Sequence, residues 1–188
     1  MQQDSSINKD KLFNAIIKNS RKKIESSLNK GANVNSKNIY GKTPLHHIAQ
    51  TGNVDNMQLL LDNGATMGVR DTRGKTPLHD AAANNKIDGI EWLINNGEYV
   101  DTKDIYEKTP LCIAVENGSI ESIKFLINKS ANVNALDTSE NTPLYYASIH
   151  KKYDSIKILL ANGAELTTKI KQGISEDLYK ELKISSKI

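Results

Sequence analysis

Histidine and cysteine are the side chains best suited to metal binding or nucleophilic catalysis, and this 188-residue chain has four histidines and one cysteine. His46 and His47 are adjacent. Consecutive residues of a helix point in different directions, so this pair is poorly placed to share a metal ion. Cys112 has no second cysteine with which to form an internal disulfide or a zinc site. These residues therefore predict no metal centre.

The acidic residues that recur along the chain also lack a catalytic arrangement. Asp71, Asp104 and Asp137 are spaced 33 residues apart. Two carboxylates close together would suggest general acid–base catalysis, whereas one carboxylate per repeat suggests hydrogen bonding within turns. The sequence has neither a glycine-rich phosphate-binding loop nor a G-x-S-x-G nucleophile motif. We therefore predict a protein that is not an enzyme and has no catalytic residue, cofactor or metal.

A short phrase that recurs every 33 residues predicts the helices that position these side chains. Its four copies begin at Thr43, Thr76, Thr109 and Thr142, and each continues with Pro-Leu. Threonine is a favoured helix N-cap, proline fits the first helical position, and leucine starts a buried stripe. A spacing without insertions across four copies indicates a structural repeat. Each copy is therefore predicted to start a helix.

A second helix is predicted in each unit. Its apolar residues recur at helical spacing and end at a glycine, or at Ser130 in the third full unit. In the first unit, Asp10 is predicted to cap the first helix, and Ser26 and Ser27 replace apolar residues of later units, which predicts a polar outer face. The predicted segments are an N-terminal capping unit at 7–37, full units at 38–70, 71–103, 104–136 and 137–169, and a C-terminal capping helix and tail at 170–188.

With T-P-L-H at a period of 33, the sequence resembles the ankyrin-repeat family over nearly its whole length. The resemblance implies a single all-α domain over 1–188, an ankyrin-repeat solenoid of stacked helix-turn-helix units joined by β-hairpin-like loops. It also implies that His46 and His79 tie neighbouring turns by hydrogen bonds. Cys112 stands at the same position of the phrase, so it is predicted to be buried in a helix.

Two positions depart from the family's pattern. The turn glycine of the family appears as Gly41 and Gly74, but Glu107 and Glu140 hold that position in the third and fourth full units. A glutamate would be strained at positive φ. We therefore predict a different local turn in these two loops.

The resemblance implies that a protein partner binds across the loop tips and the inner faces of the first helices. Packing of the repeats does not require particular side chains at these positions, so their types carry information about the partner. The predicted partner-binding residues are Ile39, Tyr40, Lys42, His47, Arg70, Thr72, Arg73, Lys75, Asp80, Lys103, Ile105, Tyr106, Lys108, Tyr146 and His150.

The loop tips combine basic side chains with two Ile-Tyr pairs. Tyrosine and arginine are frequent in binding hot spots, and exposed Ile-Tyr pairs on turns have no evident role in folding. We therefore predict a non-enzymatic protein–protein interaction module, an adaptor or an inhibitor, whose partner presents an acidic surface with apolar anchors. The alternative for the basic residues is that they only keep the loops soluble.

Composition constrains the setting of the protein. The formal net charge of +3 is too small to argue for nucleic acid, which remains an alternative only through the basic loop tips. The sequence shows no apolar run of signal-peptide or membrane-span length, so we expect a monomeric cytoplasmic protein without a membrane or small-molecule partner. Abundant Lys, Asn and Ile suggest an AT-rich genome and a second alternative, a secreted effector of an intracellular bacterium that binds a host protein.

Overall fold

The computed structural model describes residues 11–167 and Ile170. Within this part of the chain the regular secondary structure is helical, which confirms the predicted all-α repeat fold. The predicted N-cap Asp10 lies outside the described residues, and so does the predicted capping helix at 170–188 apart from Ile170. The described residues form two compact units. The first runs to Ala81 and also includes Lys86–Tyr99, and the second comprises Ala82–Asn85 and the residues from Val100 onward.

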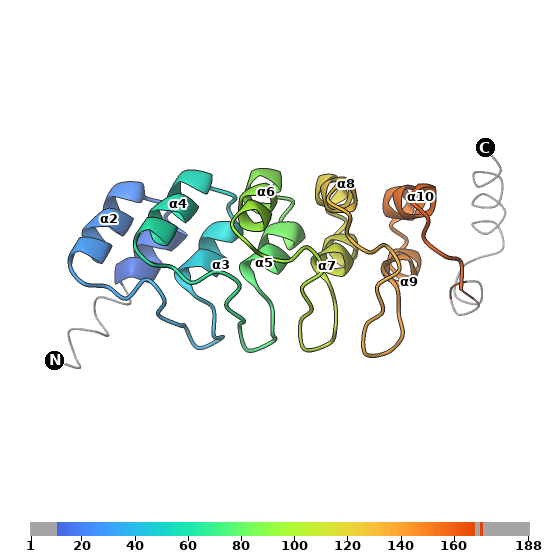
Figure 1. Ribbon diagram of the computed structural model, residues 1–188, viewed down its shortest axis with the longest axis horizontal. Coiled ribbons are helices and arrows are strands. Elements are labelled where there is room, and N and C mark those ends of the chain that lie inside the picture. The colour runs from blue at the N-terminus through green and yellow to red at the C-terminus, as the bar shows by residue number, and fades with distance from the viewer. Residues whose placement is uncertain (1–10, 168–169, 171–188) are drawn as a thin grey trace. The chain divides into compact units, whose positions relative to one another are not determined.

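Within each unit the first helices of the repeats form one layer, the second helices form another, and the long loops project beyond the first helices (Figure 1). None of the helices in the described part of the chain is long and apolar enough to cross a bilayer. The first unit starts with a helix at residues 11–17. The helices that follow are α2 Arg21–Asn29, α3 Pro44–Ala49, α4 Val54–Asp62, α5 Pro77–Ala83, α6 Ile87–Asn95, α7 Pro110–Asn117, α8 Ile120–Asn128, α9 Pro143–Ile149 and α10 Tyr153–Ala161.

The first helices of the full repeats start where the repeated phrase predicts. α3, α5, α7 and α9 all begin at the proline of the phrase. The hydroxyl of Thr109 accepts a hydrogen bond from the Cys112 N–H (3.3 Å), and the hydroxyl of Thr142 accepts one from the Tyr145 N–H (3.2 Å). These bonds satisfy N–H groups that have no partner inside the helix. The predicted threonine caps are therefore confirmed at these two helices.

The leucine of each phrase and the apolar residues of the second helices form the core of each unit. In the first unit α3 packs on α4 and α4 packs on α6, and Leu45 and Leu60 are buried. In the second unit α7 packs on α8 and α9, α10 packs on α8 and α9, and Leu111 and Leu126 are buried. Because helix pairs pack on their neighbours, the loops are positioned by local contacts.

Each loop between repeats closes on itself through the same hydrogen bonds. The Asp71 N–H donates to the C=O of Lys75 (2.9 Å), and the loops at 38–42, 104–108 and 137–141 close in the same way. A carboxylate oxygen of Asp71 also accepts from the N–H groups of Arg73 (2.8 Å) and Lys75 (2.9 Å). The prediction that the repeated aspartates bond within turns is confirmed.

The prediction of a different turn at Glu107 and Glu140 is wrong. Glu107 has a φ of 58° and Glu140 a φ of 59°, close to the 71° of Gly74. Their N–H groups donate to the C=O groups of Asp104 and Asp137 (both 3.0 Å), as the N–H of Gly74 does in its own loop. The aspartate bonds hold the loop in the same conformation, so both glutamates adopt left-handed backbone angles that cost free energy.

Glycine at these two turns is expected to stabilise the protein. The left-handed conformation costs a non-glycine residue roughly 1–2 kcal/mol, which exceeds the roughly 0.5–1 kcal/mol of extra chain entropy that glycine loses on folding. Glu140→Gly should therefore raise the free energy of unfolding by about 0.5–1 kcal/mol in urea titrations followed by circular dichroism. Glu107→Gly should raise it slightly less, because Glu107 also pairs with Lys103 (2.9 Å) at the surface.

Ser139→Gly is the matched control, because the neighbouring Ser139 is not among the residues with positive φ. This variant should leave the stability unchanged or lower it slightly. An equal gain from Ser139→Gly and Glu140→Gly would show that the left-handed strain is not the cause.

Candidate functional site

In the first unit, Ile39 and Tyr40 stand at the tip of the first loop (38–42). Ile39 is 87% exposed and Tyr40 is 62% exposed. The side-chain oxygen of Asn38 accepts the Tyr40 N–H (2.9 Å), and the Tyr40 C=O accepts bonds from the N–H and the hydroxyl of Thr72 in the next loop (both 3.0 Å). Two apolar side chains are thus presented to solvent on a backbone that is fixed by hydrogen bonds.

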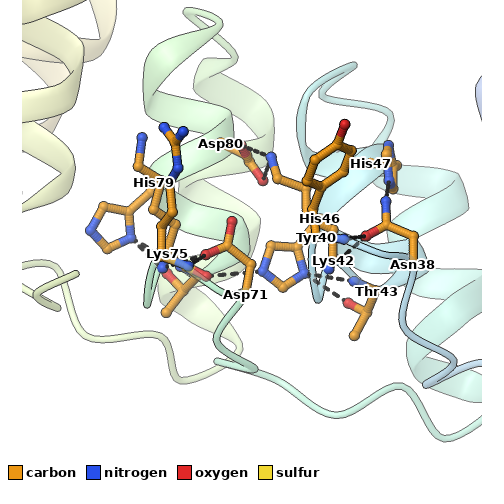
Figure 2. Close-up of polar contacts among 12 residues, drawn as sticks. Asn38, Tyr40, Lys42, Thr43, His46, His47, Asp71, Lys75, His79 and Asp80 are labelled. Carbon is orange, nitrogen blue, oxygen red and sulfur yellow. Dashed lines mark hydrogen bonds and ion pairs between the residues drawn. The ribbon is translucent and has the colours of Figure 1, made fainter. Parts of the chain in front are cut away.

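His46 links this loop to the next one (Figure 2). Its Nδ1 accepts the Thr43 N–H (3.1 Å), which leaves the ring proton on Nε2 to be donated to the C=O of Lys75 (3.0 Å). Burial lowers the pKa of His46, although the bond to Lys75 opposes this effect. His79 accepts the Thr76 N–H in the same way (3.1 Å). The prediction that the phrase histidine ties neighbouring turns is confirmed for His46.

Three of the predicted partner-binding residues, Lys42, His47 and Asp80, are bonded to other side chains of the protein. The Lys42 ammonium bonds both carboxylate oxygens of Asp80 (2.7 and 2.9 Å), and Asp80 is buried (Figure 2). The His47 Nε2 accepts the side-chain N–H of Asn38 (3.1 Å), and the ring packs edge-on against Phe13 with centroids 5.5 Å apart. Burial and then the charge of Lys42 lower the pKa of His47. These contacts hold the first loop against the helices.

The second loop of this unit carries the remaining predicted residues. Thr72 bonds Tyr40, and the guanidinium of Arg70 donates to the C=O of Gly74 (2.8 Å). Arg73 is exposed at the tip, and neither Arg73 nor Lys75 forms an ion pair within the described part of the chain. Positive charge at the tips of this unit is therefore concentrated on the second loop.

The second unit repeats the exposed pair. Ile105 is 57% exposed and Tyr106 is 51% exposed. The Asp104 carboxylate accepts the Tyr106 N–H (2.9 Å), and the Tyr106 C=O accepts the Thr138 N–H of the following loop (3.0 Å). The two Ile-Tyr pairs that the sequence analysis selected are thus held by equivalent backbone bonds in separate units.

Beneath this pair, four side chains form one polar network. The Lys108 ammonium bonds the Glu116 carboxylate and lies 4.0 Å from the centre of the Tyr146 ring. The Tyr146 hydroxyl donates to the Asp137 carboxylate. Burial alone would lower the pKa of Lys108, but Glu116 and Tyr146 outweigh it and raise that pKa. Burial together with the bond to Asp137 raises the pKa of Tyr146. The network fixes Lys108 and Tyr146 against the helices.

Ion pairs within the protein reduce the positive charge that the sequence analysis assigned to the loop tips. Lys42, Lys103 and Lys108 each pair with a carboxylate of the same unit. Sequence reasoning missed these pairs, because the partners of Lys42 and Lys108 lie on helices rather than in the loops. His150 is exposed at the end of α9.

Glu98 is a buried carboxyl group that the sequence analysis missed. It is 6% exposed. One oxygen accepts the Leu78 N–H (3.3 Å) at the start of α5, and the other has no hydrogen-bond partner among the described residues. Burial raises the pKa of Glu98 to about 7. Aligning the repeats would have revealed it, because four other repeats have a buried alanine at this position, namely Ala32, Ala65, Ala131 and Ala164.

The other side chains that could act in catalysis or metal binding are not grouped into a site within the described part of the chain. Cys112 is buried, as predicted, and burial raises the pKa of its thiol to about 11. A thiol with this pKa is almost entirely protonated at neutral pH and is a poor nucleophile. In the part of the chain that the structure describes, no three His, Cys, Asp or Glu side chains are grouped as metal ligands would be.

Helix pairs that repeat every 33 residues, with threonine-proline helix starts and self-closing loops, define a helical-repeat protein. A family model described as ankyrin repeats (3 copies) matches residues 12–104 and 90–170. The chain therefore belongs to the ankyrin-repeat family, and the resemblance in the sequence is confirmed. Ankyrin repeats are generally protein–protein interaction modules. A comparison with curated proteins found no match.

Proposed function

We propose that this protein is a non-enzymatic recognition module that binds a protein partner through the loop tips of both units. The observation that carries the proposal is the exposure of Ile39 and Tyr40 in one unit and of Ile105 and Tyr106 in the other. Exposed large apolar residues on rigid turns stabilise no part of the core. Burying these side chains against a partner would remove apolar surface from water, as the residues of a binding hot spot do.

The partner is proposed to carry acidic groups beside the apolar sites that receive the tyrosines. Arg73 and Lys75 support this, because they form no ion pair within the described residues and lie one loop away from Tyr40. Lys42, Lys103 and Lys108 contribute less, since carboxylates of the protein already neutralise them. This partial neutralisation favours a protein surface over nucleic acid, which would need many unpaired cations along the same loops.

Removing both tyrosines is expected to weaken partner binding by more than about 2 kcal/mol in total, if each is an interfacial anchor. The partner is first captured from a lysate of the source or host cell with the wild type. Its dissociation constant is then measured by calorimetry for the wild type and for Tyr40→Ala combined with Tyr106→Ala. Circular dichroism checks that the variant is folded.

The matched control is Tyr99→Ala combined with Tyr153→Ala. These two tyrosines are also exposed, by 70% and 50%, but lie outside the loop tips. The control should bind the partner as the wild type does. Unchanged affinity of the variant at Tyr40 and Tyr106 would contradict the proposal that the loop tips bind the partner. An equal loss of affinity in the tip variant and the control would show that the partner does not bind at the loop tips specifically.

A further inference from the structure

Four Asn-Gly pairs stand at the ends of α4, α6, α7 and α10, and they begin at Asn63, Asn96, Asn117 and Asn162. Asparagine is a chemically labile residue. In an Asn-Gly pair the backbone nitrogen of the glycine can attack the asparagine side chain, because glycine has no Cβ that would hinder the approach. Each pair is therefore a site of possible deamidation that the fold either protects or leaves open.

The reaction needs only water. At Asn96 the backbone nitrogen of Gly97 would form a bond to the side-chain carbon Cγ, and the bond from Cγ to Nδ2 would break. Nδ2 would leave as ammonia and take the proton of the Gly97 nitrogen. Water would then open the five-membered imide at either carbonyl, which gives aspartate or isoaspartate. One water is consumed and one ammonia is released, and nothing is oxidised or reduced.

Hydrogen bonds protect all four pairs while their helix ends are intact. Each asparagine Nδ2 donates to the C=O four residues earlier (2.8 Å). Each glycine N–H donates to the C=O three residues before the glycine (2.9–3.1 Å). At Asn96 the backbone ψ of 18° also turns the glycine nitrogen away from Cβ. The reaction therefore requires the helix end to open, and the end that opens most readily reacts first.

An asparagine of the preceding repeat braces two of these helix ends. The Asn35 side chain donates to the C=O of Gly64 (2.8 Å) and accepts the N–H of Thr66 (2.8 Å). Asn134 forms the same two bonds to the turn after α10 (3.0 and 2.9 Å). Opening the end of α4 or of α10 must therefore break the two bonds of its brace in addition to the bonds of the helix.

The end of α6 has no such brace. Gly68 occupies the position of Asn35 and Asn134 and has no side chain. Among the described residues, none donates a hydrogen bond to the C=O of Gly97. The next residue is Glu98, and one of its carboxylate oxygens is buried without a partner in the described part of the chain. A buried polar atom without a partner is unfavourable, and opening the turn would expose it to water.

The pair at the end of α7 is held by a different residue. Ser119 follows Gly118, and its hydroxyl donates to the C=O of Ala83 in the preceding repeat (2.9 Å). Its N–H donates to the C=O of Ala114 (2.9 Å). Solvent exposure does not decide between the four pairs, because the attacking nitrogen belongs to the chain itself. The end of α6 is thus the one of the four that lacks a bond from the preceding repeat.

We propose that Asn96 is a modification site, at which the folded protein deamidates before its other Asn-Gly pairs do. The conversion removes the donor to the C=O of Trp92 (2.8 Å), since a carboxylate only accepts hydrogen bonds. It also places a negative charge at the C-terminal end of α6, where the helix dipole is already negative. Isoaspartate lengthens the backbone by one carbon atom as well. The modified chain therefore has a weakened end of α6.

The test incubates the full chain at pH 8 and follows conversion at each pair by peptide mapping with mass spectrometry. In the folded wild type Asn96 should convert at least about fivefold faster than each of the other three, because fewer hydrogen bonds oppose its opening. In concentrated urea no pair is protected, and the four rates should agree within about twofold.

Two variants test the braces and serve as controls for each other. Asn35→Ala should raise the rate at Asn63 at least about fivefold and leave Asn162 within about twofold of the wild type, and Asn134→Ala should do the reverse. Circular dichroism checks that both are folded. The proposal is overturned if another pair converts first in the folded wild type, or if Asn96 leads by the same factor in urea. It is also overturned if Asn35→Ala leaves the rate at Asn63 unchanged.

Discussion

At pH 8, the Glu98→Ala variant is expected to resist urea better than the wild type. The change restores the alanine that four other repeats bury at this position, and it removes a carboxylate that is desolvated on folding. Because burial raises the pKa of Glu98 from 4.5 to about 7, its ionisation at pH 8 opposes folding. The pKa difference corresponds to about 3 kcal/mol. The costs of the vacated space and of the lost hydrogen bond from the Leu78 N–H are subtracted from it, which leaves a gain of about 1 kcal/mol.

The pH dependence of the free energy of unfolding tests the role of Glu98 more directly than a comparison at one pH. A folded-state pKa above the unfolded one means that the folded protein holds the proton more tightly. The contribution of protonated Glu98 to the free energy of unfolding is therefore fully present below about pH 4.5, and it is lost as the pH rises through 7. Between pH 5 and pH 8 the wild type should lose about 2–3 kcal/mol that Glu98→Ala does not lose. His46 and His47, whose pKa values are lowered, act in the opposite direction below pH 6.5, but they are present in both proteins and cancel in the difference.

Glu98→Gln serves as the control for side-chain size, because it retains the volume and removes the ionisation. It should lose the pH dependence as Glu98→Ala does. Fluorescence of Trp92, the single tryptophan, is the appropriate signal because Trp92 lies on α6 in the same unit as Glu98. Parallel pH profiles for the wild type and the two variants would show that the carboxyl group is not desolvated.

Loss of the His46 ring is expected to cost about 3 kcal/mol of stability. His46→Ala leaves the Thr43 N–H and the Lys75 C=O without their protein partner and opens space where a fully buried side chain stood. An unsatisfied buried polar group costs about 1–3 kcal/mol, and truncating a buried ring adds to it. The midpoint of urea unfolding, followed by Trp92 fluorescence, should therefore fall strongly.

His47→Ala is the natural control, because it changes the same residue type one position later. Its ring is half-buried and, among the described residues, forms one hydrogen bond, to Asn38 (3.1 Å), so its loss should cost about 1 kcal/mol. If the two variants unfolded at the same urea concentration, the two hydrogen bonds by which His46 links neighbouring loops would contribute no more to stability than the single contact of His47.

The helices could be predicted from sequence because their signals are local. A threonine, a proline and a leucine at the same offset in each repeat are enough to place the starts of α3 and α7, and the structure begins both at the proline. The turns at Glu107 and Glu140 were predicted wrongly for the opposite reason. Propensity disfavours glutamate at positive φ, but the bonds from the loop aspartates hold the backbone there regardless.

Predicting the candidate site was less complete, because partners of its side chains are distant in sequence. Tyr40 and Tyr106 could be selected as exposed anchors from their place in the repeat, and both are exposed. The pairing of Lys42 with Asp80, 38 residues away, could not be read from composition, and it changes the charge of the loop tip. Glu98 was hidden for a different reason, since a glutamate in a loop is ordinarily assumed to face solvent.

The hydrogen bonds from Thr72 to the Tyr40 carbonyl and from Thr138 to the Tyr106 carbonyl bear on the thermodynamics of association. A loop that is ordered only when its partner arrives loses conformational entropy at that moment, and the loss is subtracted from the affinity. Here the backbone beneath both tyrosines loses that entropy when the chain folds. Complex formation would then need little rearrangement of the loops, and variants of the exposed side chains would act mainly on how long the complex lasts rather than on how fast it forms.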